Sequence, residues 1–256
     1  MLKFFDKTKW IACGALLVAL AGCDGPMVSM SNTSPVALSA PDTHYDAVPD
    51  EGRTVPPIPV AEVPAEYLRQ AVAYPRDVPV GTIVIDPSSK HLYLITAKGH
   101  ALRYGIAVGR AGFGWSGEAD IVGRTTWPKW IPPHEMIDRR PELEKYRDVG
   151  QEGGLTNPLG ARALYLKTNG VDYGYRIHGT PEWDSIGHNA SSGCIRMINQ
   201  DVMDLYNLVP DGTHVIVLTE AGAFPTKLTV PPPAPKKVRA IKPKPVFVAE
   251  APSGRV

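Results

Sequence analysis

The chain of 256 residues is long enough for one globular domain with terminal extensions. Its apolar fraction of 43% and charged fraction of 21% are ordinary for a folded protein that buries a substantial core. The formal net charge of +1 excludes the strongly basic composition that attracts nucleic acid, so we expect no nucleic acid as a partner. The 26 prolines gather near the two ends, which indicates that the ends are organised differently from the middle.

Residues 1–23 have the organisation of an export signal. A basic start precedes an apolar run at residues 11–21, which is too short to span a bilayer comfortably. The run closes on Leu20-Ala21-Gly22-Cys23, which resembles the bacterial lipoprotein processing site. The resemblance implies cleavage before Cys23, acylation of Cys23 and anchoring in a membrane facing the periplasm, with inner or outer membrane left open. A plain secretory signal and an uncleaved anchor are the alternatives, and each of them also exports the chain.

The cysteine count singles out one thiol. The chain has three cysteines, of which Cys13 lies within the signal and Cys23 is the expected lipid site. Cys194 alone remains in the mature body, so it has no internal partner for a disulfide. Such a thiol is either reactive or a small buried apolar side chain.

The remaining chain divides into three regions by composition. Residues 24–77 are rich in Ser, Pro, Thr, Ala and Val without a clear period, which predicts a flexible tether, with one short helix at 66–73. Residues 78–220 carry the folded domain. Residues 221–256 are rich in Pro and Lys, which predicts a disordered tail. The tail is either simply solvated or holds anionic wall polymer or lipid headgroups.

Within the domain, strands are expected to outnumber helices. A hairpin is predicted where two apolar runs flank Asn169-Gly170, because this dipeptide tolerates the positive φ angles of a tight turn. Helices are predicted at 133–146 and 199–208, the second with Asn199 as its N-cap. The predicted strands are 82–85, 91–95, 101–108, 163–167, 171–177 and 213–218. The fold class is therefore mainly β with a few helices.

The segment 175–197 carries the most informative chemistry. Gly193 lets the backbone turn sharply before Cys194, so that amide N–H groups beside a nucleophile can stabilise an oxyanion. His178 stands 16 residues upstream, at a predicted strand end. An imidazole near a thiol is expected to raise its thiolate fraction. The spacing permits contact through a loop, although it does not by itself establish one.

These motifs together resemble the L,D-transpeptidase family, over about residues 78–219. They are His178-Gly179-Thr180, Ser191-Ser192-Gly193-Cys194-Ile195-Arg196, Asn157-Pro158-Leu159-Gly160 and Trp127-Pro128-Lys129-Trp130-Ile131-Pro132-Pro133. The resemblance implies an L,D-transpeptidase-like β-sandwich with Cys194 as nucleophile and His178 as proton acceptor and donor. One residue departs from the pattern: the histidine that usually precedes Gly-Cys is Ser192 here, which puts the supporting hydrogen bond of that position in doubt.

The resemblance also implies a reaction on peptidoglycan tetrapeptide stems. The thiolate attacks the carbonyl between meso-diaminopimelate and D-alanine, D-alanine leaves, and an amine or water takes the acyl group from the thioester. Arg196 is expected to pair with a substrate carboxylate, with Gly193, Ser192 and Gly179 in supporting positions. No cofactor is implied, and a zinc site built from His178, His188 and Cys194 fits no compact zinc motif.

Three functions stay open at this point. The first is a transpeptidase that forms cross-links or attaches a protein to the wall. The second is a thiol hydrolase (carboxypeptidase or amidase) on the same scaffold, and the third is a non-catalytic wall-binding lipoprotein. The presence of both His178 and Cys194 argues against the third, whereas the acyl acceptor and the oligomeric state cannot be read from the sequence. The aromatic residues Trp127, Trp130 and Trp183 either line a cleft or pack in the core, and packing is favoured.

Overall fold

The computed structural model describes residues 43–109 and 114–230. The predictions for the signal, for Cys23 and for the chain beyond residue 230 therefore lie outside the described residues. In the described ranges most regular elements are strands, as predicted, and no helix in them is long and apolar enough to cross a membrane.

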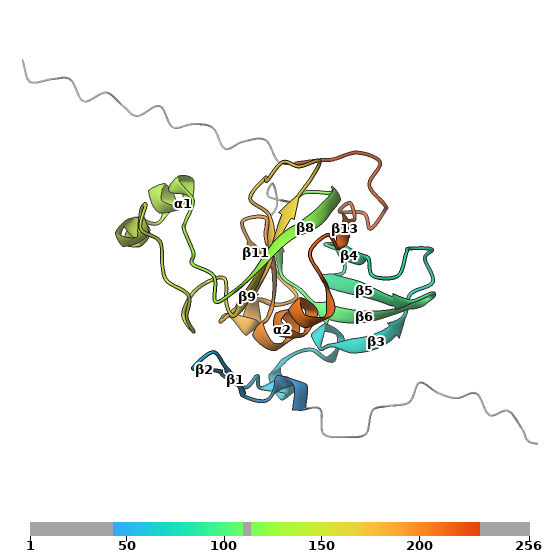
Figure 1. Cartoon of the computed structure of the whole chain (residues 1–256), viewed down its shortest axis with the longest axis horizontal. Helices are drawn as coiled ribbons and strands as arrows, with labels where there is room; N and C mark the ends of the chain where they lie inside the picture. Colours follow the sequence, from blue (N-terminus) through green and yellow to red (C-terminus); the bar gives the residue numbers. More distant parts are fainter. Residues whose placement is uncertain (1–42, 110–113, 231–256) are drawn as a thin grey trace, which may run out of the picture. The chain divides into compact units, whose positions relative to one another are not determined.

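One large mixed sheet forms the body of the domain (Figure 1). Its strand order is β12-β10-β9-β8-β13-β4-β5-β6-β3. In chain order the strands are β3 (Gln70–Ala73), β4 (Ile83–Asp86), β5 (His91–Ala97), β6 (His100–Gly105), β8 (Gly117–Thr126), β9 (Arg162–Lys167), β10 (Arg176–Thr180), β12 (Ile195–Ile198) and β13 (His214–Val217). Two-stranded sheets pair β1 (Val48–Asp50) with β2 (Arg53–Val55) and β7 (Val108–Gly109) with β11 (Asn189–Ser191).

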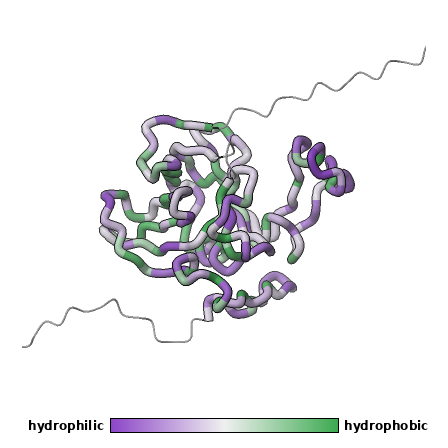
Figure 2. Tube along the Cα trace, turned by 180° about the vertical axis from the view of Figure 1, so that it is seen from behind, coloured by the Kyte–Doolittle hydropathy of each residue, from purple (hydrophilic) through white to green (hydrophobic). Residues whose placement is uncertain are grey.

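The sheet folds over on itself to enclose the main core. Strand β12 at one edge contacts β6 near the other edge, and Ala107, which follows β6, forms a bridge with Arg196 of β12. Buried side chains from both halves of the sheet, such as Ile85 and Ile177, belong to one apolar cluster. The hydropathy colouring in Figure 2 shows this apolar interior. The predicted mainly β fold is confirmed, and one continuous sheet, of nine strands in the described residues, folds over to enclose its core.

The predicted hairpin around Asn169-Gly170 is present. Asn169 and Gly170 have φ angles of 50° and 77°, and Thr168 and Val171 bond to each other across the turn. Strands β9 and β10 then pair in antiparallel fashion, with Arg176 opposite Tyr165. This hairpin delivers His178 to the centre of a short, well-buried strand.

The two helices predicted within the domain are present, with two differences. The segment 133–146 consists of α1 (His134–Arg139) and the 3₁₀ turn η4 (Pro141–Tyr146), because Pro141 cannot continue the first helix. Helix α2 (Asn199–Leu208) begins after Ile198, so the prediction of Asn199 as the N-cap is wrong. The Asn199 side chain instead accepts the backbone N–H of Ala161, which ties α2 to the start of β9.

The prediction of a flexible tether is wrong for residues 43–77. Asp50 of the β1–β2 hairpin makes a two-pronged ion pair with Arg162 and accepts the indole N–H of Trp127. The hydroxyl of Tyr45, in the 3₁₀ turn η1 (Thr43–Tyr45), donates to the buried Asp201 of α2. Composition alone suggested a tether because these short elements are held by contacts with distant parts of the chain rather than by a local period.

The predicted short helix at 66–73 is also wrong. Residues 60–73 form the 3₁₀ turns η2 (Val60–Glu62) and η3 (Ala65–Tyr67) and then strand β3, which pairs with β6. At the other end, Leu228 and Val230 pack against the main core and Thr229 bonds to Ser116. The disordered tail predicted from residue 221 therefore does not begin before the end of the described residues at 230.

Candidate active site

The parallel pair β10–β12 gathers the side chains singled out in the sequence. Its register places Ile177 beside Ile195 and His178 beside Arg196. Because side chains alternate along a strand, Ile177 and Ile195 enter the core, whereas His178, Arg196 and Cys194 lie on the opposite face. His178 and Cys194 are thus brought to the same side of the sheet by the pairing of two short strands.

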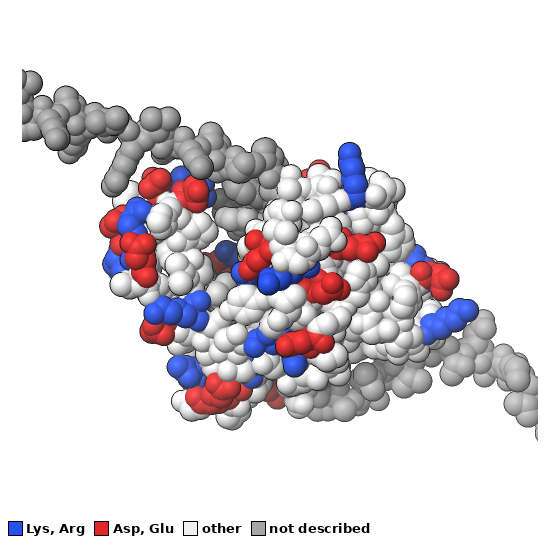
Figure 3. Space-filling view, turned by 45° about the horizontal axis from the view of Figure 1, so that its top comes forward, with Lys and Arg blue, Asp and Glu red and all other residues white. Residues whose placement is uncertain are grey.

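These residues form one wall of a cavity of about 780 Å³. We call this wall, made by Arg176, His178, Cys194 and Arg196, the sheet wall. The segment 133–146, which we call the flap, lines the cavity with Pro133, Met136, Arg139 and Arg140. In Figure 3 the charged flap is separated from the body by a hollow.

His178 is held as a neutral imidazole with a fixed ring orientation. The residue is 4% exposed, and Nδ1 lies 2.6 Å from the carbonyl oxygen of Gly179, which can only accept. Nδ1 is therefore the protonated nitrogen, and Nε2 carries a lone pair. Burial lowers the pKa of His178 to about 4, against the Gly179 hydrogen bond and helped by the nearby charges of Arg196 and Arg176. A buried imidazole that is neutral at physiological pH is suited to accept a proton.

Cys194 is a free, half-buried thiol. Burial raises its pKa above the ordinary value, although a backbone hydrogen bond with Arg176 and the charges of Arg176 and Arg196 oppose this effect. Its Sγ donates to the carbonyl oxygen of Gly174 at 3.6 Å. Burial therefore favours the neutral thiol beside a neutral imidazole in the resting protein, and the expected increase in thiolate fraction stays a prediction.

The turn before Cys194 is fixed by Ser191, a residue that the sequence reasoning had not singled out. The Ser191 Oγ donates to the carbonyl oxygen of Cys194 at 2.5 Å and accepts the N–H of Gly193 at 3.1 Å. Gly193 has a φ of 115°, which favours glycine. Because the Gly193 N–H is already bonded, it is not available to an oxyanion. The N–H of Cys194 has no hydrogen-bond acceptor within residues 43–109 and 114–230.

Ser192, which replaces the usual histidine of the motif, is exposed at the rim of the cavity. No hydrogen bond of its side chain is found in the part of the chain that the structure describes. The doubt about a supporting hydrogen bond from this position therefore stands, and the hydrogen bonds that hold the turn come from Ser191.

The two arginines of the sheet wall are each paired with a carboxylate. Arg196 Nη1 lies 2.8 Å from Glu182, and its Nε is buried without a partner. Arg176 forms two hydrogen bonds of 2.8 Å with Asp172 and lies over the ring of Tyr165. Arg176 was missed because its place beside Cys194 depends on the pairing of β10 with β12. Both cations are positioned to compensate negative charge near the thiol.

Gly179 keeps the histidine in place through close packing against α2. A side chain at this position would collide with Oδ1 of Asn199. Asn199 in turn bonds to Ala161 at the start of β9. The carbonyl that fixes the His178 ring is thus held between a helix and a neighbouring strand.

The other candidates lie apart from this site or only border it. His188 is exposed and does not line the cavity. Trp127 and Trp183 pack against apolar clusters, whereas Trp130 lines the cavity. Among the described residues, no group of three or more His, Cys, Asp or Glu side chains is arranged to hold a metal ion.

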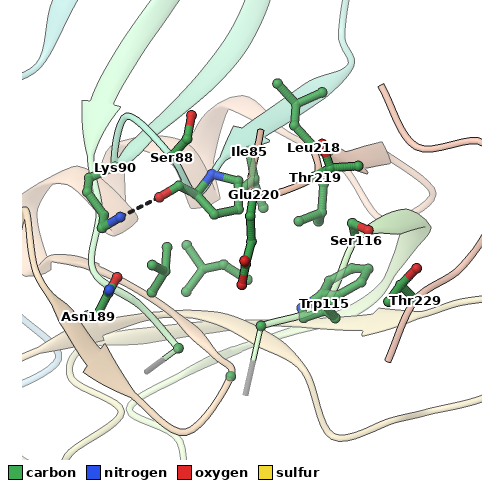
Figure 4. Close-up of a pocket in the computed structure, with 17 residues that line it drawn as sticks. Ile85, Ser88, Lys90, Trp115, Ser116, Asn189, Leu218, Thr219, Glu220 and Thr229 are labelled. Atoms are coloured by element: carbon green, nitrogen blue, oxygen red, sulfur yellow. Dashed lines mark hydrogen bonds between the residues drawn. The ribbon is translucent and has the colours of Figure 1, made fainter. Parts of the chain in front are cut away.

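A second cavity, of about 540 Å³ (Figure 4), borders the same turn at Gly193 but not at Cys194. Gly193 and Ile195 line it, and the side chain of Ile195 points opposite to that of Cys194. Figure 4 shows Glu220 directed into this cavity, while Lys90 bonds to the carbonyl of Pro87. Neither Cys194 nor His178 lines it, so the reactive groups belong to the first cavity.

A model of the family described as YkuD, the L,D-transpeptidase catalytic domain, matches residues 81–217. This match covers more than half of the chain and includes the sheet wall and the flap. The protein belongs to the L,D-transpeptidase family. The N-terminal elements from residue 43 and the C-terminal segment to residue 230 lie outside the matched range and pack against it.

Individual relatives agree with this membership. The chain is 54% identical over 92 residues to the "Putative L,D-transpeptidase YkuD" of Bacillus subtilis, covering 36% of this chain and 52% of the relative. It is 35% identical over 102 residues to the "Putative L,D-transpeptidase in ATP synthase subunits region ORF 5" of Fuscovulum blasticum, covering 40% of this chain and 49% of the relative. The chain thus spans about half the length of these relatives.

A solved structure is also similar in sequence. The "Probable carnitine operon oxidoreductase caia" of Brucella melitensis is 47% identical and is covered over 97% of its length and 62% of this chain, with a TM-score of 0.43. That name describes the other protein, and a TM-score of this size supports no conclusion about the L,D-transpeptidase chain described here.

Proposed function

We propose that this L,D-transpeptidase family member cuts the bond between meso-diaminopimelate and D-alanine in peptidoglycan tetrapeptide stems and transfers the acyl group to an amine. The observation that carries this proposal is the sheet wall. A free thiol and a buried imidazole with an available Nε2 face one cavity, and two arginines accompany them. Membership of the L,D-transpeptidase family supports peptidoglycan as the substrate.

In the first half-reaction, the Cys194 sulfur attacks the carbonyl carbon that links diaminopimelate to D-alanine. The thiol proton passes to Nε2 of His178, and His178 then gives it to the amine of the departing D-alanine. A thioester and free D-alanine result. Because both partners are neutral at rest, proton transfer accompanies the attack instead of preceding it.

In the second half-reaction, an acceptor amine attacks the thioester carbonyl. His178 takes a proton from this amine and returns it to the sulfur, so that a new amide bond forms and the thiol is regenerated. The Cys194 N–H is our candidate for stabilising the oxyanion in both steps, since the Gly193 N–H is bonded to Ser191. No redox partner is needed, because neither the carbonyl carbon nor the sulfur changes oxidation state in either half-reaction.

The test uses the purified protein, tetrapeptide muropeptides and mass spectrometry of the products. A transpeptidase yields cross-linked dimers together with free D-alanine, and Cys194→Ala yields neither. Release of D-alanine without dimers, and without transfer of the acyl group to an added amine, would favour the hydrolase alternative. No change in any muropeptide under conditions where the protein is folded would leave wall binding as the function and contradict the proposal.

We further propose that the protein is a periplasmic lipoprotein attached to a membrane through Cys23. Only the sequence supports this, because Cys23 lies outside the described residues. Mass spectrometry of the mature N-terminus is the test, and an acylated Cys23 is expected. Durable attachment needs more than one acyl chain, since a single chain binds membranes only marginally. A mature N-terminus elsewhere without lipid would contradict the proposal.

A further inference from the structure

The cavity is lined by an excess of cationic side chains. Five Lys and Arg side chains among the described residues border it, and Glu182 is the one acidic side chain there. The five are Lys129, Arg139, Arg140, Arg176 and Arg196. A concave site lined in this way favours a ligand that carries negative charge.

Four of these five cations already have a carboxylate partner. The pairs are Lys129 with Glu152, Arg140 with Glu142, Arg176 with Asp172 and Arg196 with Glu182. Arg139 forms no ion pair within the described ranges of the chain.

The acidic residues near Arg139 do not neutralise it. Glu142 is bonded to Arg140, and Asp138 lies 3.5 Å from Arg147. Glu135 stands one helical turn before Arg139 and makes no ion pair with it in the part of the flap that the structure describes. The Arg139 guanidinium thus borders the cavity with its hydrogen-bond donors uncommitted.

A tetrapeptide stem offers a matching group away from the bond that is cut. Near that bond lie the carboxylates of D-alanine and diaminopimelate, which belong with Arg176 and Arg196 on the sheet wall. The γ-linked D-glutamate comes before diaminopimelate and carries a free α-carboxylate. Cys194 and Arg139 line the same cavity, so a stem whose scissile carbonyl is at Cys194 can present this second carboxylate to the flap.

We infer that Arg139 of the flap binds the α-carboxylate of the stem's D-glutamate and makes the enzyme select stems in which this carboxylate is free over stems in which it is amidated. This inference rests on the proposed function. A guanidinium binds a carboxylate through two parallel charge-assisted hydrogen bonds, whereas a neutral amide offers one acceptor oxygen and no charge. Arg139 is exposed, so solvent reduces the preference to about tenfold in kcat/KM.

The experiment compares two donor tetrapeptides that differ only in D-glutamate or D-isoglutamine. D-Alanine release is measured with wild-type protein, Arg139→Gln and Arg139→Lys. We expect the wild type to prefer the acid donor about tenfold. Arg139→Gln should lose this preference, because its turnover of the acid donor alone becomes slower. Arg139→Lys should keep part of the preference, because it keeps the charge. Arg147→Gln is the matched control, because Arg147 directly follows the flap but bonds to Glu144 and does not line the cavity.

A second measurement keeps binding separate from turnover. In the Cys194→Ala background, calorimetry should show that Arg139→Gln weakens binding of the acid donor and leaves binding of the amidated donor unchanged. Equal turnover of both donors by the wild type, or equal slowing of both by Arg139→Gln, would overturn the inference while leaving the proposed function intact. Failure of the wild type to release D-alanine from either donor would instead contradict the proposed function.

Discussion

The two walls of the cavity are built in different ways. The sheet wall stands on β10 and β12, whose inward side chains Ile177, Ile195 and Met197 belong to the main core. The flap buries Ile137 and Leu143, but neither belongs to any of the four apolar clusters found among the described residues. Figure 2 shows the flap as mostly hydrophilic. The thiol and the imidazole are therefore on the wall that is built into the core, and Arg139 is on the wall that is not.

The largest effect is expected from removing the base on the sheet wall. His178→Ala should lower the acylation rate about 10²–10⁴-fold, because the neutral thiol then has no proton acceptor, while donor binding changes little. Single-turnover release of D-alanine measures the rate. His188→Ala is the control, since its exposed ring does not line the cavity. A larger loss in His188→Ala than in His178→Ala would show that the histidine roles are reversed.

The sheet wall should be more stable against local opening than the flap, because the two walls are built differently. Backbone amides in β10 should exchange with solvent more slowly than those in α1 by about two orders of magnitude or more, because opening β10 disrupts the main core and opening the flap does not. Hydrogen-exchange mass spectrometry on the intact protein measures both segments at once. Equal protection of the two would mean that the flap belongs to the same cooperative unit as the sheet, against this comparison.

The sequence predicted the sheet wall far better than the flap. His178, Gly193 and Cys194 could be found because motif and hairpin are local, and Asn169-Gly170 fixes the turn that leads to His178. The roles of Arg176 and Arg139 could not be found. The first depends on the parallel pairing of β10 with β12, and the second on where the flap settles across the cavity.

Two parts of the fold were missed for related reasons. Strand β8 was not predicted. Its buried and exposed residues do alternate, with Ala119 and Ile121 buried between exposed neighbours, but the alternating apolar stretch is short and is interrupted by charged residues. Residues 43–77 were taken as a tether because Pro-rich composition suggests one, whereas Asp50 fixes that segment through Arg162 and Trp127. In both cases long-range contacts decide the structure, and a single sequence does not display them.

Rigidity of the sheet wall can be tested at a glycine. Gly179→Ala should lower the free energy of unfolding by about 1–3 kcal/mol, because the new methyl group would collide with Asn199 and force β10 away from α2. Gly123→Ala is the matched control, since a side chain there meets nothing. Denaturant unfolding of both variants gives the comparison. Equal stability would show that β10 can shift without cost and is less rigid than described.

The pH dependence of kcat/KM reports on the burial of His178. Since burial lowers the pKa of His178 to about 4, the imidazole keeps its lone pair down to that pH. Activity should therefore persist as pH falls through 6.5, the ordinary value, and be lost only near pH 4. Circular dichroism at each pH confirms folding, and the amidated donor controls for titration of the D-glutamate carboxylate. An acid limb near 6.5 would show that His178 is solvated rather than buried.

The central claim is that Cys194 on the sheet wall carries the acyl group. Intact-protein mass spectrometry after brief mixing with a tetrapeptide donor, followed by peptide mapping, tests it directly. The predicted result is one added acyl stem without its D-alanine, located on the peptide that contains Cys194, absent from Cys194→Ala and slow to form in His178→Ala. An adduct on another residue, or D-alanine release that persists in Cys194→Ala, would contradict the account.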